Sequence, residues 1–164
     1  MRILYLLRHA KSSWTDASLA DFERPLKDRG REAAEQIGRF LAERKADISL
    51  LVSSPSVRTR QTVDIVLRNA SLAVQPLFDE RIYEASLNTL VRVVTELPDD
   101  QKTALLVGHN PGMEELLAFL AYETRQMPTC ALAKINLECS SWREVGRGSG
   151  RLDWFVTPKD LPNG

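Results

Sequence analysis

The sequence of 164 residues has little of what marks a secreted, membrane-bound or disulfide-rich protein. Its two cysteines, Cys130 and Cys139, are too few for a disulfide framework in a chain of this length. Neither has other potential metal ligands near it in the sequence. We expect both to be packing residues. No apolar run approaches the roughly 20 residues of a membrane span, and the first residues lack the apolar segment of a signal peptide. These absences predict a cytoplasmic protein without membrane contact.

The chain also has no excess of charge of either sign. Lys plus Arg number 22 and Asp plus Glu number 22, so no overall field favours nucleic acid or an anionic membrane. Any anion-binding site must therefore be local. Hydrophobic residues make up 43% and aromatic residues 7%, which is ordinary for a globular protein. The length predicts one domain, residues 1–164, with one sizeable core, and we expect a monomer.

Short apolar runs alternate with helical patterns over the first three quarters of the chain. Their spacing predicts buried strands and amphipathic helices in turn. The predicted strands cover residues 3–7, 48–53, 72–78 and 103–107. The predicted helices begin near Asp28, Ser54, Leu87 and Asn110. This alternation is typical of an α/β domain in which helices connect parallel strands.

The last quarter has a different pattern. Residues 130–137 and 151–156 alternate apolar and polar side chains, as half-exposed antiparallel strands do, and residues 142–145 form a candidate third strand. The predicted fold class is α/β, a three-layer α/β/α arrangement. Its central sheet is mostly parallel, with antiparallel strands added at one side.

Polar residues suited to binding an anion follow each predicted parallel strand. In chain order these residues are Arg8 and His9, then Ser53, Ser54 and Arg58, then Glu80, then His109 and Asn110. Because the carboxyl ends of parallel strands meet at one edge of a sheet, we expect these residues to lie together. Arg8 and Arg58 would repel a metal cation, whereas their forked guanidinium donors suit an anion. The two nearby helix starts would add backbone N–H donors for the same anion. The pattern predicts a phosphate site without a metal.

Three ordered motifs carry a family resemblance. They are Leu7-Arg8-His9-Ala10-Lys11-Ser12, the stretch from Ser53 to Thr62 that includes Arg58, and Gly108-His109-Asn110-Pro111-Gly112. In order and spacing they resemble the histidine phosphatase superfamily, also called the phosphoglycerate mutase-like fold. The segment Arg24-Pro25-Leu26, followed by Gly30, resembles the family's entry into its first helix. The short chain and the last motif are most similar to the SixA-like phosphohistidine phosphatase branch, although Ala10 replaces a common glycine.

The resemblance implies roles for four residues. It makes His9 the nucleophile and places Arg8, Arg58 and His109 around the phosphate. The residue chemistry agrees, because flanking cations lower the pKa of a histidine and so keep its ring nitrogen free to attack phosphorus. A phosphohistidine intermediate is then hydrolysed by water, and no cofactor is implied.

Other site residues have weaker assignments. Glu80 matches the proton donor of family members that cleave phosphate esters, whereas Glu84 could serve instead, or Glu80 could simply pair with an arginine. Ser12 and Asn110 could add hydrogen bonds to phosphate, or they could be ordinary turn and cap residues. Lys11 could raise the local positive potential.

The resulting functional hypothesis is a metal-independent phosphatase, a hydrolase acting on phosphohistidine in a signalling or phosphocarrier protein. One alternative is a small-molecule phosphomonoesterase of the same superfamily, and another is a non-catalytic phosphate-binding regulatory module. A mutase fits less well, because the chain lacks insertions that would close over a sugar phosphate and exclude water. The expected partner is a phosphorylated protein or a small phosphorylated substrate, with no nucleic acid.

Overall fold

Six strands form one mixed sheet in the order β3-β2-β4-β1-β5-β6. The computed structural model describes residues 1–162, so the predicted domain end at residue 164 lies outside the described residues. The strands are β1 (Arg2–Arg8), β2 (Leu50–Ser53), β3 (Pro76–Phe78), β4 (Thr103–Gly108), β5 (Leu132–Leu137) and β6 (Gly150–Val156). β1 to β4 run parallel, and β5 and β6 add antiparallel strands beside β1, as the sequence predicts.

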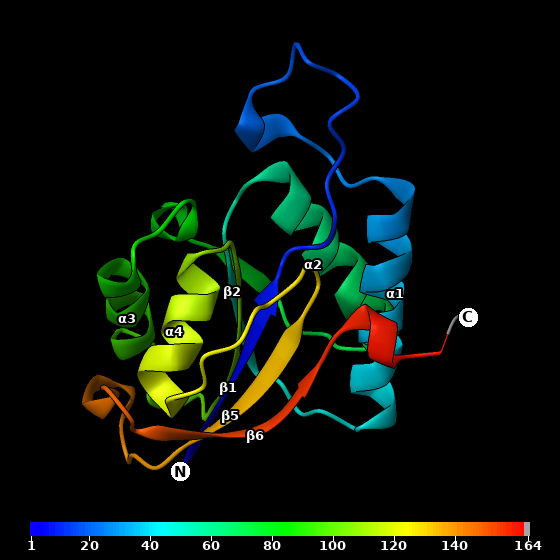
Figure 1. Cartoon of the computed structure of the whole chain (residues 1–164). Helices are drawn as coiled ribbons and strands as arrows, with labels where there is room; N and C mark the ends of the chain where they lie inside the picture. The colour runs from blue at the N-terminus through cyan, green and yellow to red at the C-terminus, as the bar shows by residue number, and fades with distance from the viewer. Residues whose placement is uncertain (163–164) are drawn as a thin grey trace.

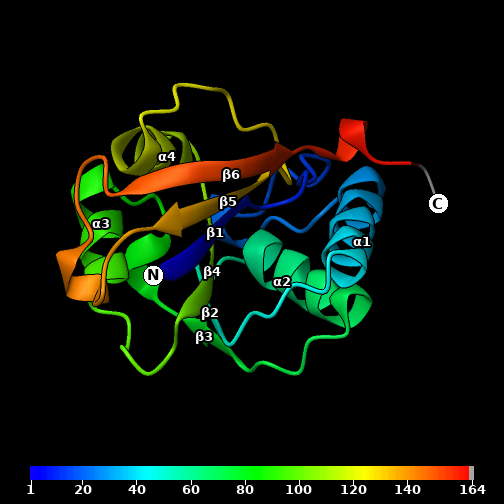
Figure 2. The same ribbon diagram turned by 90° about the horizontal axis from the view of Figure 1, so that it is seen from below.

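Helices cover both faces of the sheet (Figure 2). One face carries α1 (Asp28–Glu43) and α2 (Val57–Ala70), and the other carries α3 (Leu87–Thr95) and α4 (Gly112–Ala121). Successive side chains of a strand point to opposite faces, so β1 supplies both cores. Leu4 and Leu6 lie in the core under α3 and α4, whereas Tyr5 and Leu7 lie in the core under α1 and α2. The predicted three-layer α/β/α class is confirmed.

Two predicted strands differ from the structure. The prediction for residues 72–78 is too long, because β3 starts at Pro76 and pairs only with the short β2, which leaves residues 72–75 without a partner strand. The prediction for residues 142–145 is wrong. Residues Trp142–Glu144 form a 3-10 helix, which a capping box between Ser141 and Glu144 stabilises.

Two helices start later than predicted. α2 begins at Val57 and α4 at Gly112, so Ser54 and Asn110 lie in the turns that precede the helices. Both residues remain at the carboxyl ends of the strands, and their side chains are free to contact other elements. Within residues 1–162, no helix is long and apolar enough to cross a membrane.

The loop between β1 and α1 rises above the carboxyl edge of the sheet (Figure 1). It contains a short 3-10 helix, η1 (Asp21–Glu23), and returns so that Ser12 and Leu26 form an isolated antiparallel bridge. The first turn of α1 packs against the start of the loop. A Cβ atom at Gly30 would lie 2.1 Å from the Lys11 carbonyl oxygen, so only glycine allows this approach. The loop is therefore held close to the strand ends.

Candidate active site

A cavity of about 400 Å³ opens at the carboxyl ends of β1 and β4, beneath the loop between β1 and α1. It is lined by Arg8, His9, Lys11, Ser12, Trp14, Asp21, Arg24, Lys27, Arg58, Glu84, His109, Asn110 and Thr129. Of the residues predicted to gather at this edge, only Ser53, Ser54 and Glu80 are absent from the lining. Arginine and lysine side chains outnumber carboxylates in this lining, which makes the cavity suited to an anion.

His9 lies at the floor of the cavity, directly after β1, and is only 7% exposed. Its Nδ1 is 2.7 Å from the Ala10 carbonyl oxygen. Because a carbonyl oxygen can only accept a hydrogen bond, Nδ1 carries the proton and Nε2 has the free lone pair. The Ala10 amide in turn donates to the Thr62 hydroxyl at 3.0 Å, which ties this loop to α2. The ring of His9 is therefore oriented with a nucleophilic nitrogen.

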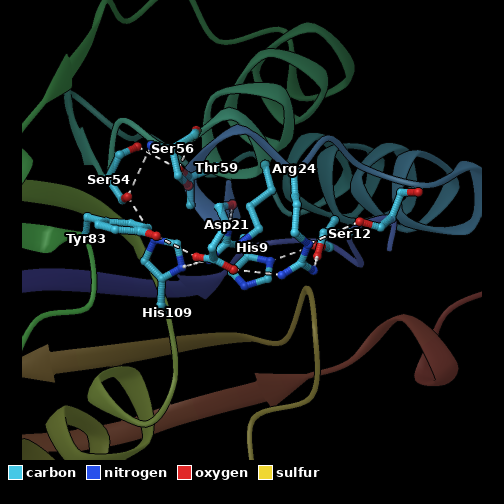
Figure 3. A network of polar contacts seen from close by, with 12 residues as sticks. His9, Ser12, Asp21, Arg24, Ser54, Ser56, Thr59, Tyr83 and His109 are labelled. Carbon is cyan, nitrogen blue, oxygen red and sulfur yellow. Dashed lines mark hydrogen bonds and ion pairs between the residues drawn. The ribbon is translucent and has the colours of Figure 1, made fainter. Parts of the chain in front are cut away.

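His109, directly after β4, lies beside His9 with the ring centroids 5.1 Å apart (Figure 3). Its Nδ1 is 3.4 Å from Nη2 of Arg58, and its Nε2 is 2.8 Å from the Ser54 hydroxyl. Since a guanidinium can only donate, the lone pair of the neutral ring is at Nδ1, and Nε2–H donates to Ser54. Arg58 therefore fixes the tautomer of His109, and the Ser54 hydroxyl accepts from its Nε2–H.

Arg58 is the second residue of α2 and is 6% exposed. Its guanidinium is held by Asp21 of η1, whose carbonyl oxygen accepts from Nη1 at 2.7 Å and whose carboxylate accepts from Nη2 at 3.0 Å. The same carboxylate accepts from the Tyr83 hydroxyl at 2.5 Å and from Arg24 at 2.8 Å. Three donors, from α2, from Tyr83 and from Arg24 in the same loop, thus converge on the carboxylate of Asp21.

Burial is the largest influence on the two imidazole rings. It lowers the pKa of His9 to about 3, with smaller contributions from His109 and the two arginines, against an opposing hydrogen bond to Ala10. Burial and then Arg58 lower the pKa of His109 to about 4. Both rings are neutral near pH 7. The flanking cations expected to lower these pKa values are therefore secondary to the loss of hydration.

These pKa shifts predict a loss of stability in mild acid. Between pH 6.5 and about 4, the unfolded chain binds protons at both histidines that the folded chain excludes. The free energy of unfolding should therefore fall as the pH is lowered through this window, by up to about 1.4 kcal/mol per pH unit for each histidine. Urea unfolding at pH 7 and pH 4.5 measures this loss. His109→Gln should reduce it, and an unchanged pH dependence in that variant would contradict the assignment.

Three further predicted residues line the cavity, and each has different hydrogen-bond partners or exposure. Arg8 donates through Nη1 to the Met127 carbonyl oxygen at 3.0 Å, which fixes its guanidinium at the end of β1. The Ser12 hydroxyl accepts from Arg24, and its own proton remains able to reach an anion. Lys11 is exposed at the opening. All three are placed where they can contact a bound anion.

Asn110 lines the cavity, but in this structure its side chain donates to protein groups and not into the cavity. Its amide nitrogen donates to the Glu114 carboxylate at 3.1 Å and to the Met127 carbonyl oxygen at 2.8 Å. Both amide protons are therefore in use. Asn110 instead connects the turn before α4 to the segment that also holds Arg8, because both side chains donate to Met127.

Glu80 is not part of the cavity. It is an exposed residue in the short 3-10 helix η2 (Glu80–Ile82) and lines a separate cavity between β2, β3 and α3. η2 carries Glu80 away from the histidines and turns Tyr83 and Glu84 toward them. The predicted placement of Glu80 is therefore corrected, and Glu84 is the residue of this segment whose carboxylate is in the lining.

The sequence did not predict Asp21, Arg24 and Tyr83 as members of the polar network. Arg24 forms part of the noted Arg-Pro-Leu segment, which was one available signal. Ser54, which was predicted at this edge, contacts His109 rather than the cavity. Asp21 is one of several acidic residues in loops, and no periodicity marks it. Among residues 1–162, no three His, Cys, Asp or Glu side chains are grouped so that they could hold a metal ion.

Comparisons with known proteins agree with this geometry. The family model described as histidine phosphatase superfamily (branch 1) matches residues 4–120. An uncharacterised chloroplastic protein of Arabidopsis thaliana is 31% identical over 96% of this chain and 78% of its own length.

Solved structures also match over almost the whole chain. A protein of Agrobacterium tumefaciens assigned as phosphohistidine phosphatase SixA is 29% identical with a TM-score of 0.83, covering 96% of this chain and 98% of its own. The protein histidine phosphatase SixA complexed with tungstate has a TM-score of 0.83 at 20% identity with the same coverage, and so shows the fold. Because the family model spans most of the sequence and all three of its motifs, this chain belongs to the histidine phosphatase superfamily.

Proposed function

We propose that this phosphatase removes phosphate from phosphohistidine in a protein, with His9 as the nucleophile. The observation that carries the proposal is the fixed orientation of His9, whose Nδ1–H is bound to the Ala10 carbonyl and whose Nε2 lone pair is free. The likeness to proteins assigned as SixA phosphohistidine phosphatases supports the choice of substrate.

The chemistry is a transfer between two imidazoles. The Nε2 lone pair of His9 forms a bond to phosphorus while the substrate N–P bond breaks, and the electron pair of that bond returns to the substrate ring. A substrate ring protonated at its other nitrogen leaves as neutral imidazole, so no separate acid is needed. An alkoxide leaving group, in contrast, needs a positioned proton donor, which typically contributes 10²–10⁴-fold.

The pocket residues match the charge on the transferring group. Arg8 and Arg58 can hold its nonbridging oxygens in line, with forked donors suited to phosphate. His109 presents a lone pair to Arg58 in the ligand-free structure, so it becomes a donor to phosphate only by taking a proton at Nδ1. A dianionic phosphoryl group beside the ring would favour that proton.

The phosphohistidine intermediate can be hydrolysed without a separate general base. Water attacks phosphorus, the electron pair of the N–P bond returns to Nε2 of His9, and both water protons leave with the phosphate as its monoanion. The opening of the cavity bears the exposed side chains of Trp14, Lys11 and Lys27. Such an opening can admit a side chain presented on another protein.

A comparison of substrates tests the proposal. Turnover of a small protein phosphorylated on histidine should exceed that of an aryl phosphate by at least about tenfold in kcat/KM, because only the ester needs an acid. Phosphoramidates are acid-labile, so the reactions must be quenched in alkali. His9→Ala measures the non-enzymatic background. If the aryl phosphate is the better substrate, the protein is a small-molecule phosphomonoesterase, and if neither is turned over, it is a phosphate-binding module.

A further inference from the structure

Asp21 places a permanent negative charge inside a cavity that otherwise suits anions. Its carboxylate is bound by Tyr83, Arg58 and Arg24. Tyr83 directly follows η2, Arg58 lies in α2, and Arg24 directly follows η1. The hydrogen bond from Tyr83, followed by the interactions with Arg58, lowers the pKa of Asp21 to about 2. The carboxylate is therefore ionised at any pH at which the protein would work, so it accepts hydrogen bonds and has no proton to donate.

The depth of the residues in the cavity places Asp21 on the side of the leaving group. His9 is 7% exposed at the floor, whereas the side chain of Asp21 is 41% exposed nearer the opening. In-line displacement requires the leaving group to depart opposite the attacking nitrogen, and hence toward the opening. Figure 3 shows Asp21 between His109 and Arg24.

Asp21 also shares a donor with the phosphate pocket. Nη2 of Arg58 is 3.0 Å from the Asp21 carboxylate and 3.4 Å from Nδ1 of His109. A phosphoryl group held by Arg58 would therefore lie close to a second anion, which opposes the binding of any additional negative charge. A leaving group that carries an N–H, or a positive charge, would experience the opposite effect.

We infer that Asp21 is a specificity-determining residue, whose carboxylate accepts the ring N–H of a phosphorylated imidazole and disfavours ester leaving groups. This inference rests on the proposed function. During transfer, His9 Nε2 bonds to phosphorus and the substrate N–P bond breaks, while the proton on the other substrate nitrogen stays in place, hydrogen-bonded to Asp21. The leaving imidazole departs neutral. An ester oxygen brings no such proton, develops negative charge as it leaves, and is repelled by the same carboxylate.

The test is whether Asp21→Asn changes kcat/KM in opposite directions for a phosphohistidine substrate and for a phosphate ester. The variant keeps the size of the side chain and an acceptor oxygen but loses the charge. Its kcat/KM for a histidine-phosphorylated protein should fall about 10- to 100-fold, as expected when a hydrogen bond loses its charged acceptor. Its kcat/KM for an aryl phosphate should rise, and its inhibition constant for orthovanadate should decrease, because an anion is removed beside the phosphate.

Two control variants distinguish the effect of the Asp21 charge from a structural effect on the loop. Asp16→Asn removes a negative charge from the same loop, at an exposed residue outside the cavity, and should change none of the three constants. Tyr83→Phe removes one hydrogen bond to Asp21 while keeping the charge, and should not produce changes of opposite sign. A parallel loss on both substrates in Asp21→Asn, or no change on either, would overturn the inference and leave the proposed function intact.

The proposed function can fail separately. If the wild-type protein does not cleave phosphohistidine at all, the substrate assignment is wrong. The vanadate measurement then still tests Asp21, since removal of its charge should tighten inhibition in Asp21→Asn and not in Asp16→Asn. Equal vanadate inhibition in the three proteins would exclude an electrostatic role for Asp21.

Discussion

His9→Ala should abolish turnover, with a loss of kcat of about 10⁴-fold or more, as is typical when a covalent nucleophile is removed. The structure makes this the largest expected effect, because Nε2 of His9 carries the free lone pair at the floor of the cavity. Rapid quench in alkali with ³²P-labelled substrate should detect a phosphoenzyme in the wild-type protein and none in the variant.

The small number of histidines limits where phosphate can be attached in the phosphoenzyme. The chain has two histidines, so any protein-bound phosphohistidine is on His9 or on His109. His109→Ala should slow the formation of the phosphoenzyme but still accumulate label. Label that survives in His9→Ala and disappears in His109→Ala would reverse the roles of the two residues.

Arg58→Ala should reduce kcat/KM by about 10³-fold or more, since an arginine that stabilises a transferring phosphoryl group contributes on that scale. Arg58→Lys should recover little of this loss. The ammonium group of lysine is a point charge, whereas the guanidinium of Arg58 contacts the Asp21 carbonyl, the Asp21 carboxylate and His109 at the same time. Steady-state kinetics on both variants would measure the difference.

Arg60 provides a matched control two residues further along α2. Its Nε donates to the Pro55 carbonyl oxygen at 2.8 Å, and its guanidinium stacks over Phe78 at 3.9 Å, outside the cavity. Arg60→Lys should therefore keep kcat/KM close to that of the wild type. An equal loss in Arg58→Lys and Arg60→Lys would indicate a general effect on α2 and would contradict a direct role for Arg58.

The residues that the sequence located best are those at the ends of buried strands. Arg8, His9 and His109 follow apolar runs whose length and composition predict strands, and the parallel arrangement then brings the strand ends together. The positions of strand ends depend on local sequence and on one topological rule. Together these placed three of the lining residues without information about any loop, and Arg58 followed from the same rule through the helix after β2.

The errors concern residues whose placement depends on the path of a loop. Glu80 follows β3, but η2 turns directly after that strand and leads its side chain to another cavity. Asp21 reaches Arg58 because the loop between β1 and α1 folds back over the strand ends, a path set by tertiary contacts such as the approach of Gly30 to Lys11. Alternation of apolar residues carries no information on either path.

The position of β1 in the middle of the sheet has a consequence for how activity is acquired. β1 is the first strand of the chain, yet its neighbours β4 and β5 begin at Thr103 and Leu132, about a hundred positions or more later. During synthesis, the segment bearing His9 emerges early and has no partner strand until most of the chain has been made. Contacts so distant in sequence form slowly. In refolding experiments, recovery of turnover should accordingly follow the signal of helix formation rather than accompany it.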